Sequence, residues 1–395
     1  MIGGNENRLL RYYNQERDPA VRVCYFGTYR KEYSRNKIMM AALESAEVQL
    51  TQCHATLWRG IQDRVETTQS GWKKPAFWWR VMKTYAKLIW RFLKIGKFDI
   101  LMVGYPGQFD VFLGKLFAFL TGKPLVWDVF MSIYLVAKER QLHQKSPFSV
   151  RMIRWFEKNA LKLPNLLIQD TAEYMAWFEK EYGLSPERFK LIPTGADDRI
   201  FTPLEDSPGQ EDGPFTVLYY GTFIPNHGVM KIARAAQILS DQKDIRFEMI
   251  GDGPDKAPFE AYVAENRLSN VAMLDWMPQE DLLARITAAD VCLGAFGHTP
   301  QSLMTVQNKI YECLAMGKPV ITGQSAAVAA SLPEGTLLTC SREDPQNLAD
   351  AILKLKNKPA LRRRLADKAA AVYHQNFSIR SLGRQLRTTL EDLIK

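Results

Sequence analysis

The chain has 395 residues, which is too long for one comfortable hydrophobic core and predicts two or three domains. Apolar residues make up 46% of it and charged residues 24%, as in a soluble globular protein, and because no apolar run approaches ~18–20 residues we expect no transmembrane helix. The net charge of +9 favours an anionic partner, whether a membrane surface, a phosphate-bearing substrate or nucleic acid.

The amino-terminal segment, MIGGNENRLLRYYNQERDP, is polar and charged and lacks the apolar core of a signal peptide. We therefore expect a cytoplasmic protein. The five cysteines have no C-x-x-C spacing, which indicates neither a zinc site nor a disulfide framework.

A first strand, VRVCYF at 21–26, ends at Gly27, and a helix is expected over 35–46. A strand, a glycine and a helix in this order are typical of the phosphate-cradling entry of an open α/β sheet. An ordinary surface loop fits these residues equally well.

The segment 73–97 predicts a basic amphipathic helix, because the stretch 71–97 holds eight basic residues and no acidic one. Basic residues beside tryptophan are typical of a helix in an anionic membrane interface, where each basic residue contributes roughly 1 kcal/mol. The alternatives are a surface helix with solvated lysines and a nucleic-acid contact, for which no reading motif is present. The side chains assigned to the membrane contact are Trp78, Trp79, Arg80, Lys83, Lys87, Arg91 and Lys94.

A buried strand is expected at 98–103 and another at 125–127, with Asp128 at the tip of the second. The carboxyl ends of parallel strands face the ligand crevice of an open α/β sheet. Asp128 is therefore a candidate for a catalytic role or for binding an acceptor hydroxyl. The alternative is an aspartate that caps the following helix.

A linker is predicted at 205–213, where EDSPGQEDG is acidic, rich in proline and glycine, and free of apolar residues. It separates an amino-terminal domain, 1–204, from a second α/β domain, 214–378. The adjacent acids Asp197 and Asp198 precede it, and because such pairs on a turn are more often caps than ligands, we expect no metal site.

The second domain opens with another strand followed by glycine, since a strand at 215–220 leads to Gly221 and Thr222. A helix is expected from about Gly228. A later strand closes on a G-x-G turn that ends at Gly253, which is a weak signal by itself.

The stretch 289–323 predicts a strand, a polar loop, a short helix and a second strand, which is one step of a parallel α/β sheet. Asn308, Lys309 and Glu312 lie in the first turns of the helix and are expected to point into the ligand crevice. A helix N-terminus and Lys309 favour phosphate, while a carboxylate one turn later can accept two ribose hydroxyls. The spacing suits a sugar nucleotide; the alternative is a solvated Lys–Glu pair.

This stretch also resembles a known family. The pattern K-x-x-E-x-x-A-x-G-K-P-V-I from Lys309 to Ile321 is similar to the nucleotide-sugar motif of family-4 retaining glycosyltransferases, which have the GT-B fold. Residues 190–203, KLIPTGADDRIFTP, resemble the signature that closes the first domain of those enzymes. The resemblance implies an α/β architecture of two Rossmann-like domains that face each other across a cleft, with a carboxy-terminal crossover helix at 379–395.

In that family the glutamate that matches Glu312 binds the ribose, and a second glutamate eight residues earlier faces the donor sugar. The second position is occupied here by Met304. The family usually holds the pyrophosphate with basic residues in the loop after the strand that matches 215–220. No basic residue lies between Gly221 and Gly228, so backbone amides and His227 are expected to serve beside Lys309, unless His227 is a structural cap.

The resemblance implies three sets of site residues. The donor-binding set is Gly27, Gly221, Thr222, His227, Gly253, Met277, Asn308, Lys309 and Glu312. The acceptor set is Arg35, Asn36 and Asp128, and the catalytic set is Asp128, Lys309 and Glu312.

The implied activity is transfer of a sugar from a nucleotide-diphosphate donor to a hydroxyl, with retention and without a metal or other cofactor. Together with the basic helix, it implies a lipid-linked or glycan acceptor, as in bacterial surface-polysaccharide assembly, and a location on the inner face of the cell membrane. Nucleic acid is not an expected partner. The alternative is a non-catalytic GT-B relative that binds nucleotide sugars as a partner or scaffold at the membrane.

Overall fold

The computed structural model describes residues 21–57, 74–203 and 213–395. They form two parallel six-stranded sheets, with strand orders β2-β1-β3-β4-β5-β6 and β12-β11-β10-β7-β8-β9. The first sheet consists of β1 (Arg22–Gly27), β2 (Gln49–His54), β3 (Ile100–Val103), β4 (Leu125–Asp128), β5 (Leu166–Gln169) and β6 (Phe189–Leu191). The second consists of β7 (Phe215–Tyr220), β8 (Ile245–Ile250), β9 (Val271–Leu274), β10 (Val291–Leu293), β11 (Val320–Gly323) and β12 (Leu338–Cys340).

Helices cover both faces of the first sheet, so its central strands are buried along their whole length and are apolar except for Asp128 and Gln169 at the ends of β4 and β5. One face packs against α4 (Pro75–Phe92), α5 (Asp110–Thr121), α8 (Pro147–Ala160) and α9 (Ala172–Tyr182). The other face packs against α2 (Ser34–Ser45) and α18 (Ile379–Ile394). Shorter elements connect these layers: α6 (Ile133–Glu139), α7 (Leu142–Lys145) and the 3-10 helix η2 (Pro186–Arg188).

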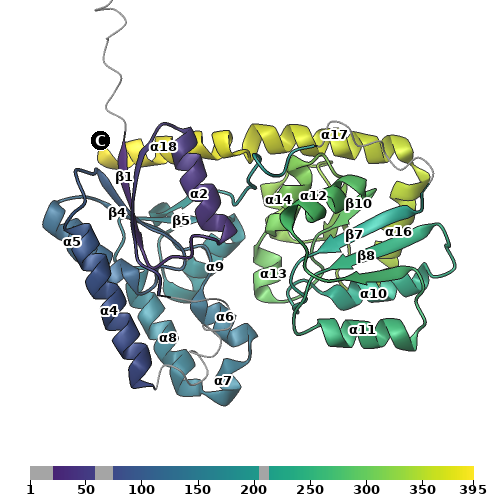
Figure 1. Cartoon of the computed structure of the whole chain (residues 1–395), viewed down its shortest axis with the longest axis horizontal. Coiled ribbons are helices and arrows are strands. Elements are labelled where there is room, and N and C mark those ends of the chain that lie inside the picture. Colours follow the sequence, from purple (N-terminus) through teal and green to yellow (C-terminus); the bar gives the residue numbers. More distant parts are fainter. Residues whose placement is uncertain (1–20, 58–73, 204–212) are drawn as a thin grey trace, which may run out of the picture.

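The second sheet has the same layered arrangement. Its first face packs against α10 (Val229–Ile238), α11 (Lys256–Glu265) and α16 (Pro345–Asn357). Its second face packs against α12 (Gln279–Ala288), α14 (Asn308–Ala315), α15 (Ala326–Ser331) and α17 (Pro359–Asn376). The short helix α13 (Pro300–Met304) lies on the side that faces the first domain (Figure 1). The predicted pair of Rossmann-like domains is confirmed.

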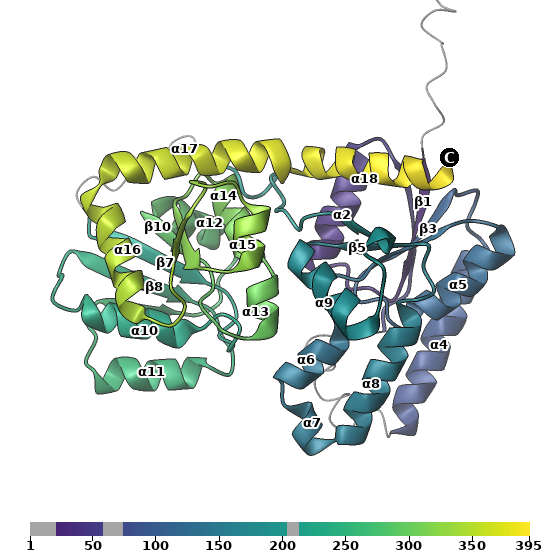
Figure 2. The ribbon, with the colours of Figure 1, turned by 180° about the vertical axis from the view of Figure 1, so that it is seen from behind.

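The last two helices join the domains, because α17 runs along the second domain and α18 continues onto the first (Figures 1 and 2). The crossing of α18 with α2 is close: a Cβ on Gly383 would lie 2.4 Å from the Ala42 carbonyl oxygen, so only glycine fits there. Ser45 Oγ adds a hydrogen bond of 3.2 Å to the Ile379 carbonyl oxygen. This is the predicted carboxy-terminal crossover helix. The predicted linker lies outside the described residues except for Gly213.

Candidate functional site

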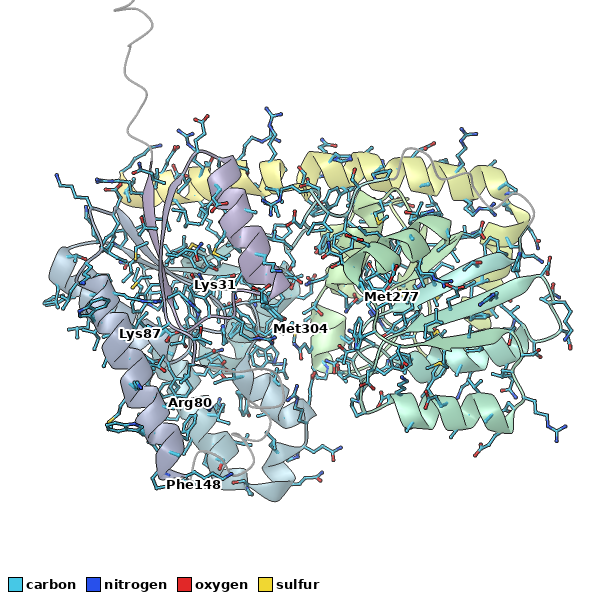
Figure 3. The ribbon with its side chains drawn as sticks, viewed as in Figure 1. Lys31, Arg80, Lys87, Phe148, Met277 and Met304 are labelled. Atoms are coloured by element: carbon cyan, nitrogen blue, oxygen red, sulfur yellow. The ribbon has the colours of Figure 1, made fainter. Side chains whose placement is uncertain are left out.

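The loops that follow the strands of the two sheets meet between the domains. Thr171 Oγ1, just beyond β5, donates a hydrogen bond of 2.5 Å to the Met304 carbonyl oxygen at the end of α13. The Glu139 carboxylate accepts hydrogen bonds from Asn226 Nδ2 at 3.0 Å and from the Gln301 backbone N–H at 2.7 Å. Figure 3 shows Met304 at this boundary. The carboxyl ends of both sheets therefore border one region, where an open α/β sheet binds its ligands.

On the second-domain side of this boundary, Lys309 reaches from the first turn of α14 to Gly221, the glycine that follows β7. A Cβ on Gly221, whose φ is +139°, would lie 2.8 Å from Lys309 Nζ, so the glycine allows the ammonium to lie against the backbone. Lys309 is buried, and Nζ has no hydrogen-bond partner among the described residues. Nζ lies 3.8 Å from the centre of the Tyr219 ring, a cation–π contact.

Burial lowers the pKa of Lys309 to about 7. An ammonium that is buried without hydrogen-bond partners is costly, and an anionic ligand would remove that cost. The arrangement can therefore bind phosphate.

His227 lies beside Lys309 but is held as a neutral ring. Its Nδ1 lies 2.7 Å from the Thr222 carbonyl oxygen and 2.9 Å from Tyr219 Oη. Because a carbonyl oxygen only accepts, Nδ1 carries the proton and Nε2 is an acceptor. Burial, followed by the charge of Lys309, lowers the pKa of His227 well below its usual value. His227 can thus donate from Nε2 to a phosphate only if ligand binding protonates it.

Glu312 lies one turn after Lys309 and accepts a hydrogen bond of 2.8 Å from Tyr220 Oη on β7. Burial raises the pKa of its carboxyl group, against the opposing effects of Tyr220 and Lys309. Among the described residues its only hydrogen bond reaches Oε2, so Oε1 remains available as an acceptor. Asn308 is half-buried at the start of α14.

The other predicted donor residues of the second domain surround this group more loosely. Thr222 is exposed, and its carbonyl oxygen holds Tyr219 and His227. Met277 packs against the core cluster that contains Tyr220. Gly253 is required by the backbone, because a Cβ there would lie 2.4 Å from the Phe223 carbonyl oxygen. This packing accounts for the glycine without a ligand.

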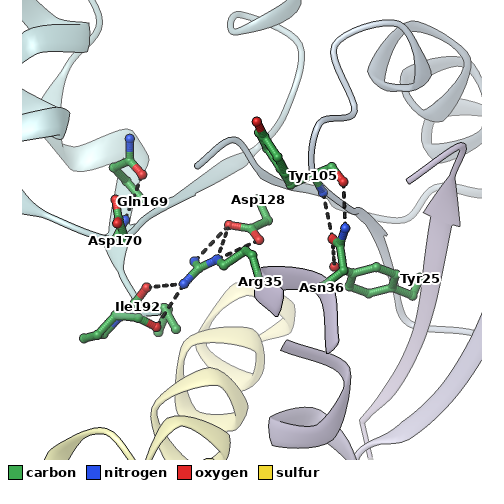
Figure 4. A network of polar contacts seen from close by, with 9 residues as sticks. Tyr25, Arg35, Asn36, Tyr105, Asp128, Gln169, Asp170 and Ile192 are labelled. Carbon is green, nitrogen blue, oxygen red and sulfur yellow. Dashed lines mark hydrogen bonds and ion pairs between the residues drawn. The ribbon is translucent and has the colours of Figure 1, made fainter. Parts of the chain in front are cut away.

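The first domain contradicts the expectation that Arg35 and Asp128 are open to an acceptor. Both side chains are fully buried and form an ion pair, with Arg35 Nη2 2.9 Å from Asp128 Oδ1 and Nε 2.9 Å from Oδ2 (Figure 4). Arg35 Nη1 also donates to the carbonyl oxygens of Ile192 and Pro193, at 2.9 Å each. The pair joins α2, β4 and the chain after β6, so it acts in this structure as an internal brace.

Asn36 and Gly27 are likewise occupied by the fold rather than open to a ligand. Asn36 is buried; its Nδ2 donates to the carbonyl oxygens of Arg30 and Tyr105, and its Oδ1 accepts from Tyr25 Oη (Figure 4). A Cβ on Gly27 would lie 2.6 Å from a carboxylate oxygen of the buried Asp110. The glycine therefore lets the end of β1 pack against the start of α5.

Three polar side chains at or just after the ends of β5 and β6 were not predicted to belong to the site, although Gln169 and Asp170 stand at the carboxyl end of β5, where such sheets bind ligands. Gln169 Nε2, Asp170 Oδ1 and Thr194 Oγ1 are buried and have no hydrogen-bond partner among the described residues. Burial raises the pKa of Asp170 to about 7, and the charge of Arg35 opposes the rise. Because Asp170 adjoins Thr171, which contacts Met304, these unpaired atoms lie near the domain boundary.

Except for Lys94, the residues assigned to the membrane contact lie on α4, which ends at Phe92 and is therefore shorter than the predicted helix. Lys73 lies outside the described residues, and Lys94 follows the helix with Nζ 3.5 Å from the centre of the Trp90 ring. Arg91 donates to the His54 carbonyl oxygen, and Arg80 lies over the Phe77 ring. Exposed on the helix are Trp78, Trp79, Lys83 and Lys87.

Within residues 21–57, 74–203 and 213–395, no group of three or more His, Cys, Asp or Glu side chains could hold a metal ion. Nor does any helix in those segments have the length and apolarity needed to cross a bilayer.

Residues 214–358, which include Gly221, His227, Lys309 and Glu312, match the family described as "Glycosyl transferases group 1". Among characterised relatives, the alpha-D-kanosaminyltransferase of Streptomyces kanamyceticus is 25% identical over 287 residues, 70% of this chain and 72% of the relative. A GDP-mannose-dependent monoacylated alpha-(1-6)-phosphatidylinositol monomannoside mannosyltransferase of Corynebacterium glutamicum is 23% identical over 54% of this chain and 58% of its own length.

Solved structures show the same fold. Sucrose-phosphate synthase of Thermosynechococcus elongatus superposes with a TM-score of 0.70 at 16% identity, over 94% of this chain and 99% of that one. HepE of Anabaena, solved with UDP and glucose, superposes with a TM-score of 0.66 at 14% identity, over 94% and 100% of the two chains. The architecture is that of the GT-B fold, and residues 214–358 are similar to the group 1 glycosyltransferases.

Proposed function

We propose that this protein transfers a sugar from a nucleotide-diphosphate donor to a hydroxyl group, with retention of anomeric configuration and without a metal ion. The observation that carries the proposal is the buried Lys309 ammonium, which lies against Gly221 without a hydrogen-bond partner among the described residues. A diphosphate in that position would supply the missing acceptors. The family match over 214–358 and the UDP complex of HepE support the choice of donor.

Each side chain of this group has a distinct role in the proposed reaction. Lys309 binds the diphosphate and stabilises the negative charge that grows on it as the sugar–phosphate bond breaks. Glu312, held through Oε2 by Tyr220, accepts the ribose hydroxyls through Oε1. His227 keeps the loop after β7 against Tyr219 and gains a proton if a phosphate oxygen approaches Nε2.

We assign the acceptor to the class of lipid-linked or otherwise membrane-borne glycans. Exposed tryptophan and lysine side chains on α4 are the reason, because this combination favours an anionic membrane interface. The mannosyltransferase relative from Corynebacterium glutamicum is named for a phosphatidylinositol-linked acceptor. The proposed location is therefore the inner face of the cell membrane. Asp128, being buried against Arg35, acts on the acceptor only by positioning the strand ends.

The donor assignment is tested by binding. Purified protein is screened by thermal shift against UDP, GDP, UDP-glucose and GDP-mannose, since a ligand of the folded state raises its melting temperature. Calorimetry then compares the wild type with Lys309→Ala and Glu312→Ala, which we expect to weaken binding of the best ligand at least about tenfold. Lys354→Ala and Glu265→Ala change exposed residues of the same domain and are the matched controls. Unchanged affinity in the two site variants would reject the assignment.

Turnover separates an enzyme from a non-catalytic nucleotide-sugar-binding protein. The wild type is incubated with the donor found by the screen, and release of the free nucleoside diphosphate is followed with and without membrane extract. Release that needs Lys309 supports catalysis. Tight binding without any release would leave only the binding function.

A further inference from the structure

Large apolar side chains are exposed on three helices of the first domain, α4, α5 and α8. Only α4 was predicted from its basic residues to contact a membrane. Phe119 on α5 is 79% exposed, Trp79 on α4 is 66% exposed and Trp155 on α8 is 61% exposed. Elsewhere in the described residues, exposed apolar side chains are scattered singly, as is normal for a soluble surface. The exposed set on and beside the three helices is Trp78, Trp79, Met82, Ile89, Trp90, Leu93, Phe109, Phe112, Leu116, Phe119, Leu120, Phe148, Met152 and Trp155.

The three helices are neighbours, so these side chains share one side of the domain. The rings of Phe92 on α4 and Phe117 on α5 stack with centroids 3.9 Å apart. Phe156 on α8 contacts the rings of Phe109 and Phe112 at the start of α5, with centroids 4.7 Å apart in both pairs. Figures 1 and 2 show the three helices together on the side of the domain away from α18.

The charge of this surface has a single sign. Lys83, Lys87 and Arg151 are exposed on α4 and α8. The only carboxylates on the three helices are Asp110 and Glu157, which are 1% and 0% exposed. Both accept hydrogen bonds inside the domain, Asp110 from Tyr85 Oη at 2.7 Å and Glu157 from Tyr182 Oη at 2.6 Å. The three helices therefore present aromatic rings and cations to solvent and no carboxylate.

We propose that the outer faces of α4, α5 and α8 form one surface that binds an anionic lipid bilayer, with the aromatic residues of α5 entering the interface. Such an interface takes up apolar side chains while its phosphate groups pair with lysine and arginine. A second copy of this chain is a poorer occupant, because two identical surfaces would bring like charges together. Helices α5 and α8 then contribute to the free energy of bilayer binding in addition to the basic helix α4.

The position of the surface relates it to the proposed reaction. Asp110, the first residue of α5, accepts a hydrogen bond of 2.7 Å from the Thr28 backbone N–H, in the loop after β1. The exposed ring of Phe109 precedes it in the loop after β3. A bilayer against α5 thus lies close to the carboxyl ends of two strands, where a membrane-borne acceptor would enter. The link between this surface and acceptor entry rests on the proposed transferase activity, whereas binding of the bilayer itself does not.

The test is co-sedimentation of the full chain with vesicles of phosphatidylcholine, with and without phosphatidylglycerol. Phe119→Ser with Leu120→Ser on α5 should lower the partition coefficient on anionic vesicles about tenfold or more, and Trp155→Ser on α8 should lower it severalfold. Ile238→Ser, at a residue of α10 that is 43% exposed, is the matched control and should bind like the wild type. Because all four positions are on the surface, thermal melting should be nearly unchanged and serves as the folding control.

Wild-type binding by the α5 and α8 variants would overturn the three-helix surface, even if changing Lys83, Lys87 and Arg91 to Glu releases the protein. Absence of vesicle binding by the wild type would also overturn it, and concentration-dependent self-association that the α5 variant abolishes would then assign the surface to a second copy. Equal losses in the Ile238→Ser control would make the effect nonspecific and reject the proposal. UDP and GDP binding, measured in the same samples, reports separately on the proposed function.

Discussion

Two buried cations at the strand ends of the two domains have opposite surroundings. Arg35 in the first domain meets Asp128 and two backbone carbonyl oxygens, so its charge and donors are satisfied by the protein. Lys309 in the second domain is also buried, yet Nζ has no hydrogen-bond partner among the described residues and faces Gly221. A satisfied buried cation supports the fold, whereas an unsatisfied one costs stability unless a ligand completes it. Arg35 is thus satisfied within the fold, whereas the unsatisfied Lys309 fits the diphosphate-binding role proposed for it.

The largest effect should come from breaking the satisfied pair. Arg35→Ala leaves Asp128 buried without its partner, and such a change costs roughly 3–5 kcal/mol of unfolding free energy. Urea denaturation followed by circular dichroism measures this loss. Arg22→Ala, which breaks the partly exposed Arg22–Asp99 pair on the same sheet, is the control and should cost much less. If Arg35→Ala is as stable as the wild type but does not transfer sugar to an acceptor, the Arg35–Asp128 pair belongs to the acceptor site after all.

Asp170 is a third buried ionisable group at the strand ends, and its Oδ1 has no hydrogen-bond partner among the described residues. Its pKa is raised to about 7 in the folded protein, so the folded state binds the proton more tightly than the unfolded chain does. The stability that this protonation contributes is therefore present below pH ~4 and is lost as the pH rises to about 7. Asp170→Asn should be more stable than the wild type at pH 8, by up to about 4 kcal/mol, and equal to it near pH 4.

Thermal melting of both proteins across this pH range measures the difference. The matched control is Asp350→Asn, at an exposed residue of α16, which should show no such pH dependence. A constant difference between wild type and Asp170→Asn at every pH would mean that the effect is not one of protonation.

Replacing Lys309 should weaken ligand binding by less free energy than the loss of stability expected for Arg35→Ala. Unlike Arg35→Ala, it should not destabilise the ligand-free protein. Lys309→Met removes a charge-assisted contact to phosphate, worth about 1.5–3 kcal/mol, which is roughly a 10–100-fold loss of affinity for the nucleoside diphosphate. Without ligand the variant should be at least as stable as the wild type at pH 7, because the buried amine resists protonation. Calorimetry and urea denaturation measure the two quantities, and loss of stability together with binding would make Lys309 a structural residue like Arg35.

The place of Lys309 could be predicted from the sequence, whereas the pairing of Arg35 with Asp128 could not, for a physical reason. The helix that begins at Asn308 was expected to place Lys309 at the strand ends, because parallel strands bring their carboxyl ends to one edge. The pairing of Arg35 with Asp128 was not expected, because the two residues are 93 positions apart. A polar residue after a strand has the same local pattern whether its partner is a ligand or another side chain.

The features that the sequence did not predict are those whose environment depends on the rest of the fold, including the exposed face of α5 but not the helix itself. The edge strand β2, QLTQCH, has mostly exposed, polar residues and lacks an apolar pattern, so only its pairing with β1 identifies it. Helix α5 has apolar side chains on nearly every side, which leaves its exposed face undefined until its neighbours α4 and α8 are known. The short helices α6, α7 and α13 are too brief to show a period.

The smallest expected effect is the uptake of a proton by the protein when the nucleoside diphosphate binds. Because the pKa of Lys309 is about 7, most molecules carry a neutral amine at pH 8, and a bound diphosphate raises this pKa by pairing with the ammonium. Binding of UDP or GDP, whichever the screen identifies, should then take up close to one proton at pH 8 and much less at pH 6, where the amine is already charged. Calorimetry in buffers of different ionisation enthalpy measures the uptake. Lys309→Met should remove most of the uptake, whereas His227→Gln should leave most of it. If uptake disappears with His227→Gln and persists in Lys309→Met, the titrating phosphate ligand is the histidine, and the unsatisfied lysine does not mark the diphosphate site.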